Sequence, residues 1–259
     1  MQNTLEFPDL LRLIDERSAA FRAAVSAAPS LDLQVPTCPE WTLLDLVQHL
    51  AEGRVSWAAT VAAGPDAATK APLGSPPPER DTATMLAWLA DSTQELVDAL
   101  QEAGPDRGCW TWWGDSQSPN TSGAVARHQL QQMAVHTYDA QLTAGAPEPL
   151  PVEVALDGVE EFLVTCCATT SAWPHEPSVV EYHATEGRSW RVWLSAEGAR
   201  VARLTPGTES PGADPVHASA RGTAHELVLF FYGRIPPESL ELEGDPRVFD
   251  QLFAWDPSA

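Results

Sequence analysis

The sequence predicts an α+β protein of two domains, an N-terminal four-helix bundle at 1–147 and a small C-terminal α+β domain at 152–259. Two observations lead to this prediction. In the first part of the chain, four segments of helical length carry apolar residues at three- and four-residue steps, as antiparallel bundle helices do. After the prolines at 147, 149 and 151, which are typical of a linker, short segments have the composition and alternation of strands.

Each predicted helix of the first domain has recognisable ends. The second has the clearest start, because Thr42 is a favourable N-cap and Asp45, three residues later, approximates a capping box. Glycine followed by proline, at Gly64 and Gly104, is typical of a helix end. Residues 64–79 are rich in Pro, Gly and Ala and predict a long exposed loop. The predicted helices are 6–28, 42–64, 82–103 and 122–143.

The second domain is predicted to be a small sheet with helices against it. The predicted helices are 154–168 and 223–232, with a last helical turn at 249–255. The predicted strands are 179–184, 189–194, 200–204 and 216–220, and Glu186-Gly187-Arg188 predicts the turn between the first two. In the first domain, the prolines within 29–41 predict a loop between the first two helices.

The composition of the chain argues against two classes of binding partner. The formal net charge of −21 over 259 residues repels nucleic-acid phosphates and anionic lipid, so neither a nucleic acid nor a membrane surface is expected as a partner. The sequence contains no apolar run of the ~20 residues that a membrane-spanning helix needs. It also opens with no recognisable leader, and its four cysteines lack metal-clip spacing. A cytoplasmic protein with reduced thiols is therefore expected.

Two histidines on separate predicted helices indicate a metal site inside the bundle. His49 and His136 carry imidazoles, the commonest metal ligands in proteins, and facing helices are a usual place to assemble such sites. Gln132 lies one turn before His136 on the same face. His128 lies about 12 Å from His136 along the axis and cannot share its ion. From spacing alone, a histidine on a helix is more commonly a hydrogen-bonded core or surface residue.

Several segments resemble one known family. They are Cys38-Pro39-Glu40-Trp41-Thr42 with His49, Trp110-Thr111-Trp112-Trp113, Val135-His136-Thr137-Tyr138-Asp139-Ala140, and the tail Gly222-Thr223-Ala224-His225-Glu226-Leu227. Together they resemble the mycothiol-dependent maleylpyruvate isomerase family of actinobacteria, whose bundle is similar to DinB-like metal-binding domains. The resemblance covers nearly the whole chain, and its first and third segments are the most specific parts.

The resemblance implies a divalent metal, usually zinc, held by two histidines and a carboxylate, at the positions of His49, Gln132 and His136. Here the chain departs from the family, which usually has His-Glu where this sequence has Gln131-Gln132. An amide thus replaces the expected carboxylate. Three outcomes follow: a more weakly held and more Lewis-acidic metal, a different ion, or an empty and degenerate site.

The chemistry that the resemblance implies is activation of mycothiol, a low-molecular-weight thiol, for attack on a small electrophilic substrate. The outcome would be isomerisation if the thiol is expelled again, or transfer if the adduct is the product. The alternatives are a non-catalytic small-molecule binding protein with a degenerate metal site, and a thiol-independent natural-product tailoring enzyme on the same fold.

Four further residues are candidates for the site. The guanidinium of Arg221 suits a carboxylated substrate, so Arg221 is the candidate catalytic residue. Trp112 and Trp113 are candidates for the wall of a cofactor pocket, with a plug over the bundle core as the alternative. Asp139 is placed to orient a ligand histidine, or to lie on the helix surface.

Overall fold

The computed structural model describes residues 5–205 and 215–255, which form two compact units. The first, here called the helical unit, comprises the described residues up to Trp112 together with Asn120–Leu150. The second, here called the sheet unit, comprises Trp113–Pro119 and the described residues from Pro151 onward. The predicted α+β fold class is confirmed. The short segment Trp113–Pro119 belongs to the sheet unit, a detail that a contiguous division into 1–147 and 152–259 does not contain.

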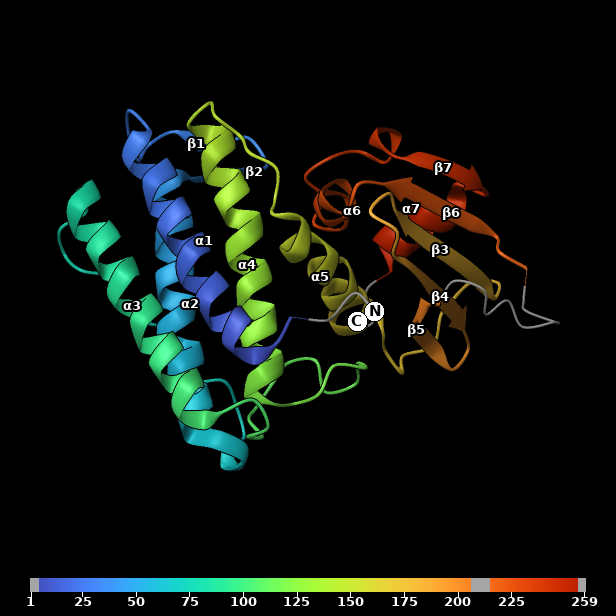
Figure 1. Ribbon diagram of the computed structural model, residues 1–259, viewed down its shortest axis with the longest axis horizontal. Coiled ribbons are helices and arrows are strands. Elements are labelled where there is room, and N and C mark those ends of the chain that lie inside the picture. The colour runs from blue at the N-terminus through green and yellow to red at the C-terminus, as the bar shows by residue number, and fades with distance from the viewer. Residues whose placement is uncertain (1–4, 206–214, 256–259) are drawn as a thin grey trace. The chain divides into compact units, whose positions relative to one another are not determined.

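Four long helices build the helical unit and run alongside one another (Figure 1). Their spans match the predicted helices closely: α1 (Phe7–Ala27), α2 (Leu43–Ala63), α3 (Thr82–Ala103) and α4 (Ser122–Thr143). The capping box of α2 is present as predicted. The Thr42 hydroxyl accepts from the Asp45 amide at 3.2 Å, and the Asp45 carboxylate accepts from the Thr42 amide at 2.8 Å. Gly64 ends the helix with φ of 73°, a conformation that glycine adopts without strain.

The stretch 29–41, predicted as a loop, contains a small antiparallel ribbon instead. Its strands are β1 (Gln34–Val35) and β2 (Cys38–Thr42). The Gln34 side-chain amide donates to the Trp41 carbonyl at 2.8 Å. The prolines in this stretch argued against strands, because proline within a sheet is confined to edge strands, strand starts and bulges. The consequence is that Trp41 is fixed directly before α2.

The interior of the helical unit is mostly apolar, and it includes a buried arginine that the sequence did not reveal. Phe21, Leu46, Val47 and Met133 are fully buried in one cluster. Arg54 is buried as well, and its guanidinium donates to the Ser18 hydroxyl at 3.2 Å. Burial lowers the pKa of Arg54 to about 9, so it remains charged at neutral pH.

The sheet unit contains a five-stranded sheet in the order β5-β4-β3-β6-β7, in which β3 and β6 are parallel and the other neighbours antiparallel (Figure 1). The strands are β3 (Ser178–Ala184), β4 (Ser189–Ser195), β5 (Gly198–Leu204), β6 (Ala218–Gly222) and β7 (Glu241–Gly244). The helices are α5 (Val152–Phe162), α6 (Ala224–Phe231) and α7 (Arg247–Ala254), with the short helical turns η2 (Leu163–Cys167) and η3 (Pro237–Ser239). A further short turn, η1 (Gly64–Asp66), follows α2 in the helical unit.

Three details of the sheet unit differ from the prediction. The helix predicted at 154–168 ends at Phe162, and a π-helical turn, η2, continues it to Cys167. The strand predicted at 216–220 lies at Ala218–Gly222, and β7 was not predicted. Among the described residues, no helix has the length and apolar character needed to cross a membrane.

Candidate functional site

His49 from α2 and His136 from α4 converge in the helical unit. Their ring centroids lie 5.4 Å apart, with the rings edge to face. Trp41 from β2 lies beside both, at 4.7 Å from His49 and 6.2 Å from His136 between centroids. Two residues far apart in sequence thus meet, because α2 and α4 pack together and the ribbon before α2 places an indole over the pair.

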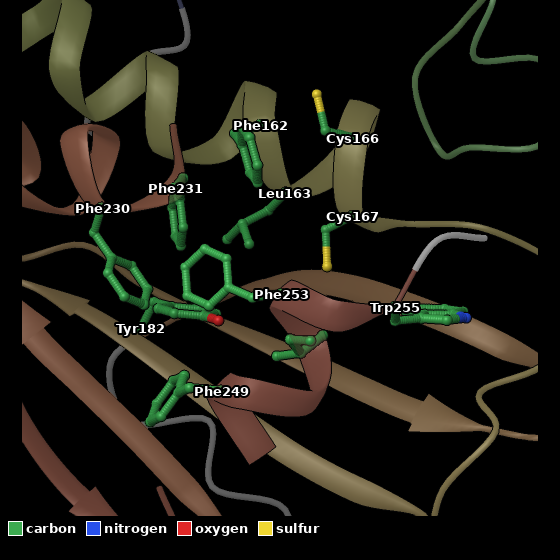
Figure 2. A pocket seen from close by; sticks show the side chains of 11 residues that line it. Phe162, Leu163, Cys166, Cys167, Tyr182, Phe230, Phe231, Phe249, Phe253 and Trp255 are labelled. Carbon is green, nitrogen blue, oxygen red and sulfur yellow. The ribbon is translucent and has the colours of Figure 1, made fainter. Parts of the chain in front are cut away.

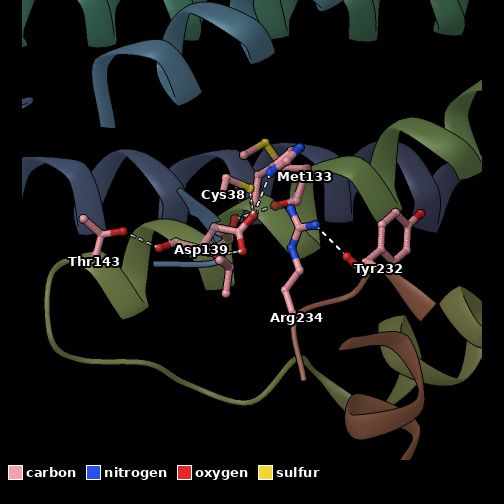
Figure 3. A network of polar contacts seen from close by, with 9 residues as sticks. Cys38, Met133, Asp139, Thr143, Tyr232 and Arg234 are labelled. Atoms are coloured by element: carbon pink, nitrogen blue, oxygen red, sulfur yellow. Dashed lines mark hydrogen bonds and ion pairs between the residues drawn. The ribbon is translucent and has the colours of Figure 1, made fainter. Parts of the chain in front are cut away.

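A buried carboxylate fixes the orientation of His136. The Asp139 carboxylate is fully buried one turn further along α4, and its Oδ2 lies 2.8 Å from Nδ1 of His136. The Thr37 hydroxyl donates to the other oxygen of Asp139 at 2.6 Å. Figure 3 shows Asp139 beside Cys38, whose sulfur lies 4.0 Å from the carboxylate. When Nδ1 donates to Asp139, Nε2 keeps its lone pair and can serve as an acceptor or a ligand.

His49 is held in its neutral form. Desolvation by the surrounding side chains, with smaller contributions from His136 and Lys70, lowers the pKa of His49 to about 4. Part of the His49 side chain remains exposed to solvent. At pH 7 the His49 imidazole is therefore neutral, the protonation state that a ligand or general base requires.

His49 opens onto a cavity of about 170 Å³ in the helical unit, here called the polar cavity. Gln132 lines this cavity, so the residue predicted as a third ligand lies in the same cavity as His49. His128 lines it too and meets Trp112 edge to face at 5.6 Å between centroids. The full lining is His49, Leu50, Gly53, Trp57, Lys70, Trp112, His128, Gln129 and Gln132.

Lys70, the single lysine of the sequence, lies in the polar cavity. Its ammonium nitrogen lies 4.8 Å from the centroid of the Trp57 ring, which is within cation–π distance. Burial lowers its pKa, and within the described part of the chain no carboxylate forms an ion pair with it. A partly buried cation without an acidic partner can bind an anionic group of a ligand.

The loop that carries Lys70 is fastened to α2. The Ala71 amide donates to the Thr60 hydroxyl at 2.9 Å, and the Gly74 amide donates to the Glu52 carbonyl at 3.2 Å. A Cβ at Gly74 would lie 2.9 Å from the Cβ of Val55, so only glycine allows this close approach. The stretch 64–79, predicted as an exposed loop, therefore includes a fixed wall of the polar cavity.

We looked for a metal site built from charged or imidazole ligands alone. Across residues 5–205 and 215–255, no group of three or more His, Cys, Asp or Glu side chains is arranged to hold a metal ion. The glutamine at 132 accounts for this in part, because an amide stands where the family resemblance implies a carboxylate. Metal binding by His49, Gln132 and His136 stays a prediction.

The other predicted site residues have different environments. Trp112 is 49 % exposed, lines the polar cavity and belongs to the helical unit. Trp113 belongs to the sheet unit, is buried, and donates its indole N–H to the Pro119 carbonyl at 3.2 Å. Arg221 lies exposed on β6, in a loose ion pair with Glu241 at 3.8 Å. Cofactor binding by the two tryptophans and catalysis by Arg221 stay predictions.

Three residues of this site received no role from the sequence: Trp41, Lys70 and His128. Each carried a signal. Trp41 lies in the specific motif before α2, and a lone lysine in a chain of net charge −21 is unusual in itself. His128 shares a helical stripe with His136, but only the structure shows that it lines the cavity onto which His49 opens.

Comparisons with known proteins cover both units. A family model described as the mycothiol maleylpyruvate isomerase N-terminal domain matches residues 11–141. A second, for the C-terminal domain of the same isomerase, matches residues 153–251. No curated protein sequence matches the chain significantly.

Two solved structures share the fold. One is a crystal structure of the mycothiol-dependent maleylpyruvate isomerase, with a TM-score of 0.61 and 12 % identity over 92 % of this chain and 93 % of that chain. The other is a histidine-to-alanine mutant of that enzyme, with a TM-score of 0.60 and 11 % identity over the same shares. At this identity, the structural similarity establishes the fold only.

Proposed function

The chain belongs to the mycothiol maleylpyruvate isomerase family, and from this premise we propose that it is a metal- and mycothiol-dependent isomerase or transferase acting on a small electrophilic substrate. The convergence of His49 and His136, with centroids 5.4 Å apart, is the observation that carries the proposal. The structural neighbours act on maleylpyruvate, which makes it the first substrate to test.

The two imidazoles fit a common metal ion. With metal–nitrogen bonds of about 2.1 Å and a tetrahedral angle, two bound imidazole rings have centroids roughly 5 Å apart, close to the separation found here. Asp139 supports the same interpretation, since histidine ligands of metals commonly donate their other ring N–H to a carboxylate. His49 and His136 would hold the ion, with the Gln132 carbonyl oxygen as a third, neutral donor. A divalent cation there would supply the Lewis acidity that lowers the pKa of a bound thiol.

The remaining roles follow from the polar cavity. Lys70 would bind an anionic group of the substrate or thiol, because its charge lies in the cavity without an acidic partner among the described residues. Trp112 and Trp57 offer ring faces that limit the access of water to the ligand. Asp139 keeps the proton of His136 on Nδ1 and so holds the ring in one orientation.

The reacting thiol would come from outside the protein. Burial raises the pKa of the Cys109 thiol, and it raises those of Cys166 and Cys167 still further. Such thiols stay protonated at neutral pH and are poor nucleophiles. Cys38 is half-buried and packs against the apolar core of the helical unit. These environments favour a diffusible thiol such as mycothiol over a protein cysteine.

One observation favours a second candidate function. Gln132 replaces the carboxylate of the family pattern, and the described residues contain no cluster of three strong metal ligands. The chain could therefore be a small-molecule binding protein that keeps the fold and has lost the metal. The two candidates make opposite predictions for the purified protein.

Metal analysis discriminates between them. We expect about one zinc per chain in the unaltered protein, lost in His49→Ala and in His136→Ala and retained in His175→Ala, an exposed histidine of the sheet unit that serves as a matched control. Zinc absent from the unaltered protein but bound by Gln132→Glu would instead indicate a degenerate site. Zinc bound equally by all variants would contradict both assignments.

Retention on immobilised mycothiol then tests the thiol. We expect the zinc-loaded protein to be retained and to be released by a chelator, because binding of the thiolate depends on the cation. Retention that is unaffected by the chelator, or no retention of the zinc-loaded protein, would contradict thiol activation by the metal. The latter would favour a tailoring enzyme that works without a thiol.

A further inference from the structure

The sheet unit contains a second cavity, of about 240 Å³, whose lining is mainly aromatic. It lies between η2, α6, α7 and strand β3, and it is here called the aromatic cavity (Figure 2). Its principal lining residues are Phe162, Tyr182, Phe230, Phe231, Phe253 and Trp255. All of them belong to the sheet unit, so the cavity is independent of the function proposed for the helical unit.

The rings that form the wall are arranged edge to face and face to face around the space. Phe162 and Phe231 are stacked with centroids 5.0 Å apart, and Tyr182 meets Phe231 edge to face at 4.9 Å. Phe230 meets Phe253 edge to face at 5.0 Å. Such walls present both faces and edges of rings, the two surfaces against which a further planar ring packs favourably.

The cavity wall carries no charge. No Asp, Glu, Lys, Arg or His is among the residues that line it. Burial raises the pKa of Cys167 to about 12 and that of Cys166 higher, so both thiols stay protonated. The Cys167 sulfur points toward the rings in Figure 2, where a neutral thiol behaves as a soft, polarisable apolar group. A charged ligand would lose its hydration here without gaining a partner.

Two features distinguish this cavity from an accidental packing gap. The helix α5 leads into it through a π-helical turn, a rare conformation that occurs frequently at functional sites. Phe253 on α7 is 53 % exposed although its neighbours Val248 and Phe249 on the same helix are buried. An exposed aromatic ring at the edge of an apolar cavity provides a surface along which an apolar molecule can enter.

From volume, ring geometry and neutrality together, we propose that the aromatic cavity binds a neutral, planar aromatic molecule of one or two rings. An engineered apolar cavity of about 150 Å³ binds benzene, so the larger space here accommodates a bicyclic molecule. The wall selects for flatness through its ring faces and against charge through its lack of ionic partners.

Binding of indole to the full-length protein tests the proposal. Titration calorimetry and saturation-transfer NMR should show one site for indole, with at least tenfold weaker binding of indole-3-carboxylate and of cyclohexanol. The first analogue adds a charge to the same ring system, and the second is neutral but not planar. Equal or tighter binding of either analogue would overturn the proposal, as would the absence of indole binding.

Two variants locate the site. Cys167→Leu adds volume inside the cavity, and Phe253→Ala removes an exposed ring at its edge without opening the core. Each should weaken indole binding at least tenfold, whereas Val152→Ala, which alters an exposed apolar residue elsewhere in the sheet unit, should leave it unchanged. Thermal unfolding of each variant checks that it is folded. Unchanged indole affinity in both folded variants would place the binding elsewhere and refute the assignment.

Discussion

The polar cavity of the helical unit and the aromatic cavity of the sheet unit differ in the origin of their side chains. The polar cavity gathers His49, Lys70 and Gln132 from two helices and a fastened loop. The aromatic cavity is lined by rings and thiols from the ends of three helical segments and one strand. Reactive groups thus lie in the first cavity, whereas the second offers only shape and apolar surface.

The two cavities show how burial changes the pKa values, and so the reactivity, of the side chains in each unit. In the helical unit, desolvation lowers the pKa of His49 to about 4 and also lowers the pKa of Lys70, which has no acidic partner among the described residues. In the sheet unit, burial keeps Cys166 and Cys167 protonated and so removes their nucleophilicity. Desolvation thus favours a neutral imidazole that can bind a ligand in the polar cavity, and unreactive protonated thiols in the aromatic cavity.

The largest expected effect concerns Asp139, which connects His136 to the ribbon before α2. We expect Asp139→Asn to weaken zinc binding by about 10- to 100-fold, because the amide can no longer act as a strong acceptor for His136 Nδ1–H. Competition with a chromophoric chelator measures this affinity. A matched control is Asp98→Asn, an exposed aspartate on α3 whose carboxylate contacts only Gln94 among the interactions described.

A structural role alone would lower the stability of Asp139→Asn without altering the zinc affinity of the folded fraction. Urea unfolding of the metal-free protein separates the two effects. Unchanged affinity for zinc in the folded variant would mean that Asp139 does not orient His136 for metal binding.

Lys70 gives a smaller expected effect, on substrate binding. We expect Lys70→Met to raise the KM for an anionic substrate by about tenfold or more with little change in kcat, because a charge-assisted hydrogen bond to a ligand contributes about 1.5–3 kcal/mol. Steady-state kinetics with maleylpyruvate and mycothiol measures both constants. Lys70→Arg keeps the charge and should restore part of the binding.

If Lys70→Met instead lowered kcat about tenfold and left KM unchanged, Lys70 would be assigned to the chemical step. If the variant lost turnover, substrate binding and thermal stability together, the cation would be supporting the fold through its contact with Trp57. Either result would weaken the description of the polar cavity as a binding site for anions.

The smallest expected effect compares the helix starts of the two units. Both α2 and α6 begin with a capping box, formed by Thr42 with Asp45 and by Thr223 with Glu226. We expect Thr42→Ala and Thr223→Ala each to lower the free energy of unfolding by about 1 kcal/mol, measured by urea denaturation. Only the first should also weaken zinc binding, since α2 carries His49. Equal effects on zinc binding would show that the two units are coupled.

Local sequence signals account for most of the fold. The four long helices were predicted within one or two residues, because their apolar faces, the Thr42 cap and Gly64 are local features that the chain carries wherever it packs. The ribbon at 34–42 and the π-helical turn η2 were not predicted, because each depends on pairing or packing with neighbouring segments. Strand β7 was missed for the same reason, since it is defined by its pairing with β6.

The sequence by itself determined the family, the two halves of different character, and the pair of histidines on amphipathic helices. Only the tertiary structure decided that those two rings meet beside Trp41, and that the single lysine shares a cavity with His49. Helix periodicity fixes which face a residue occupies but not which residue of another helix it meets. That choice is made by long-range packing and by loop contacts such as Ala71 with Thr60, which no local pattern encodes.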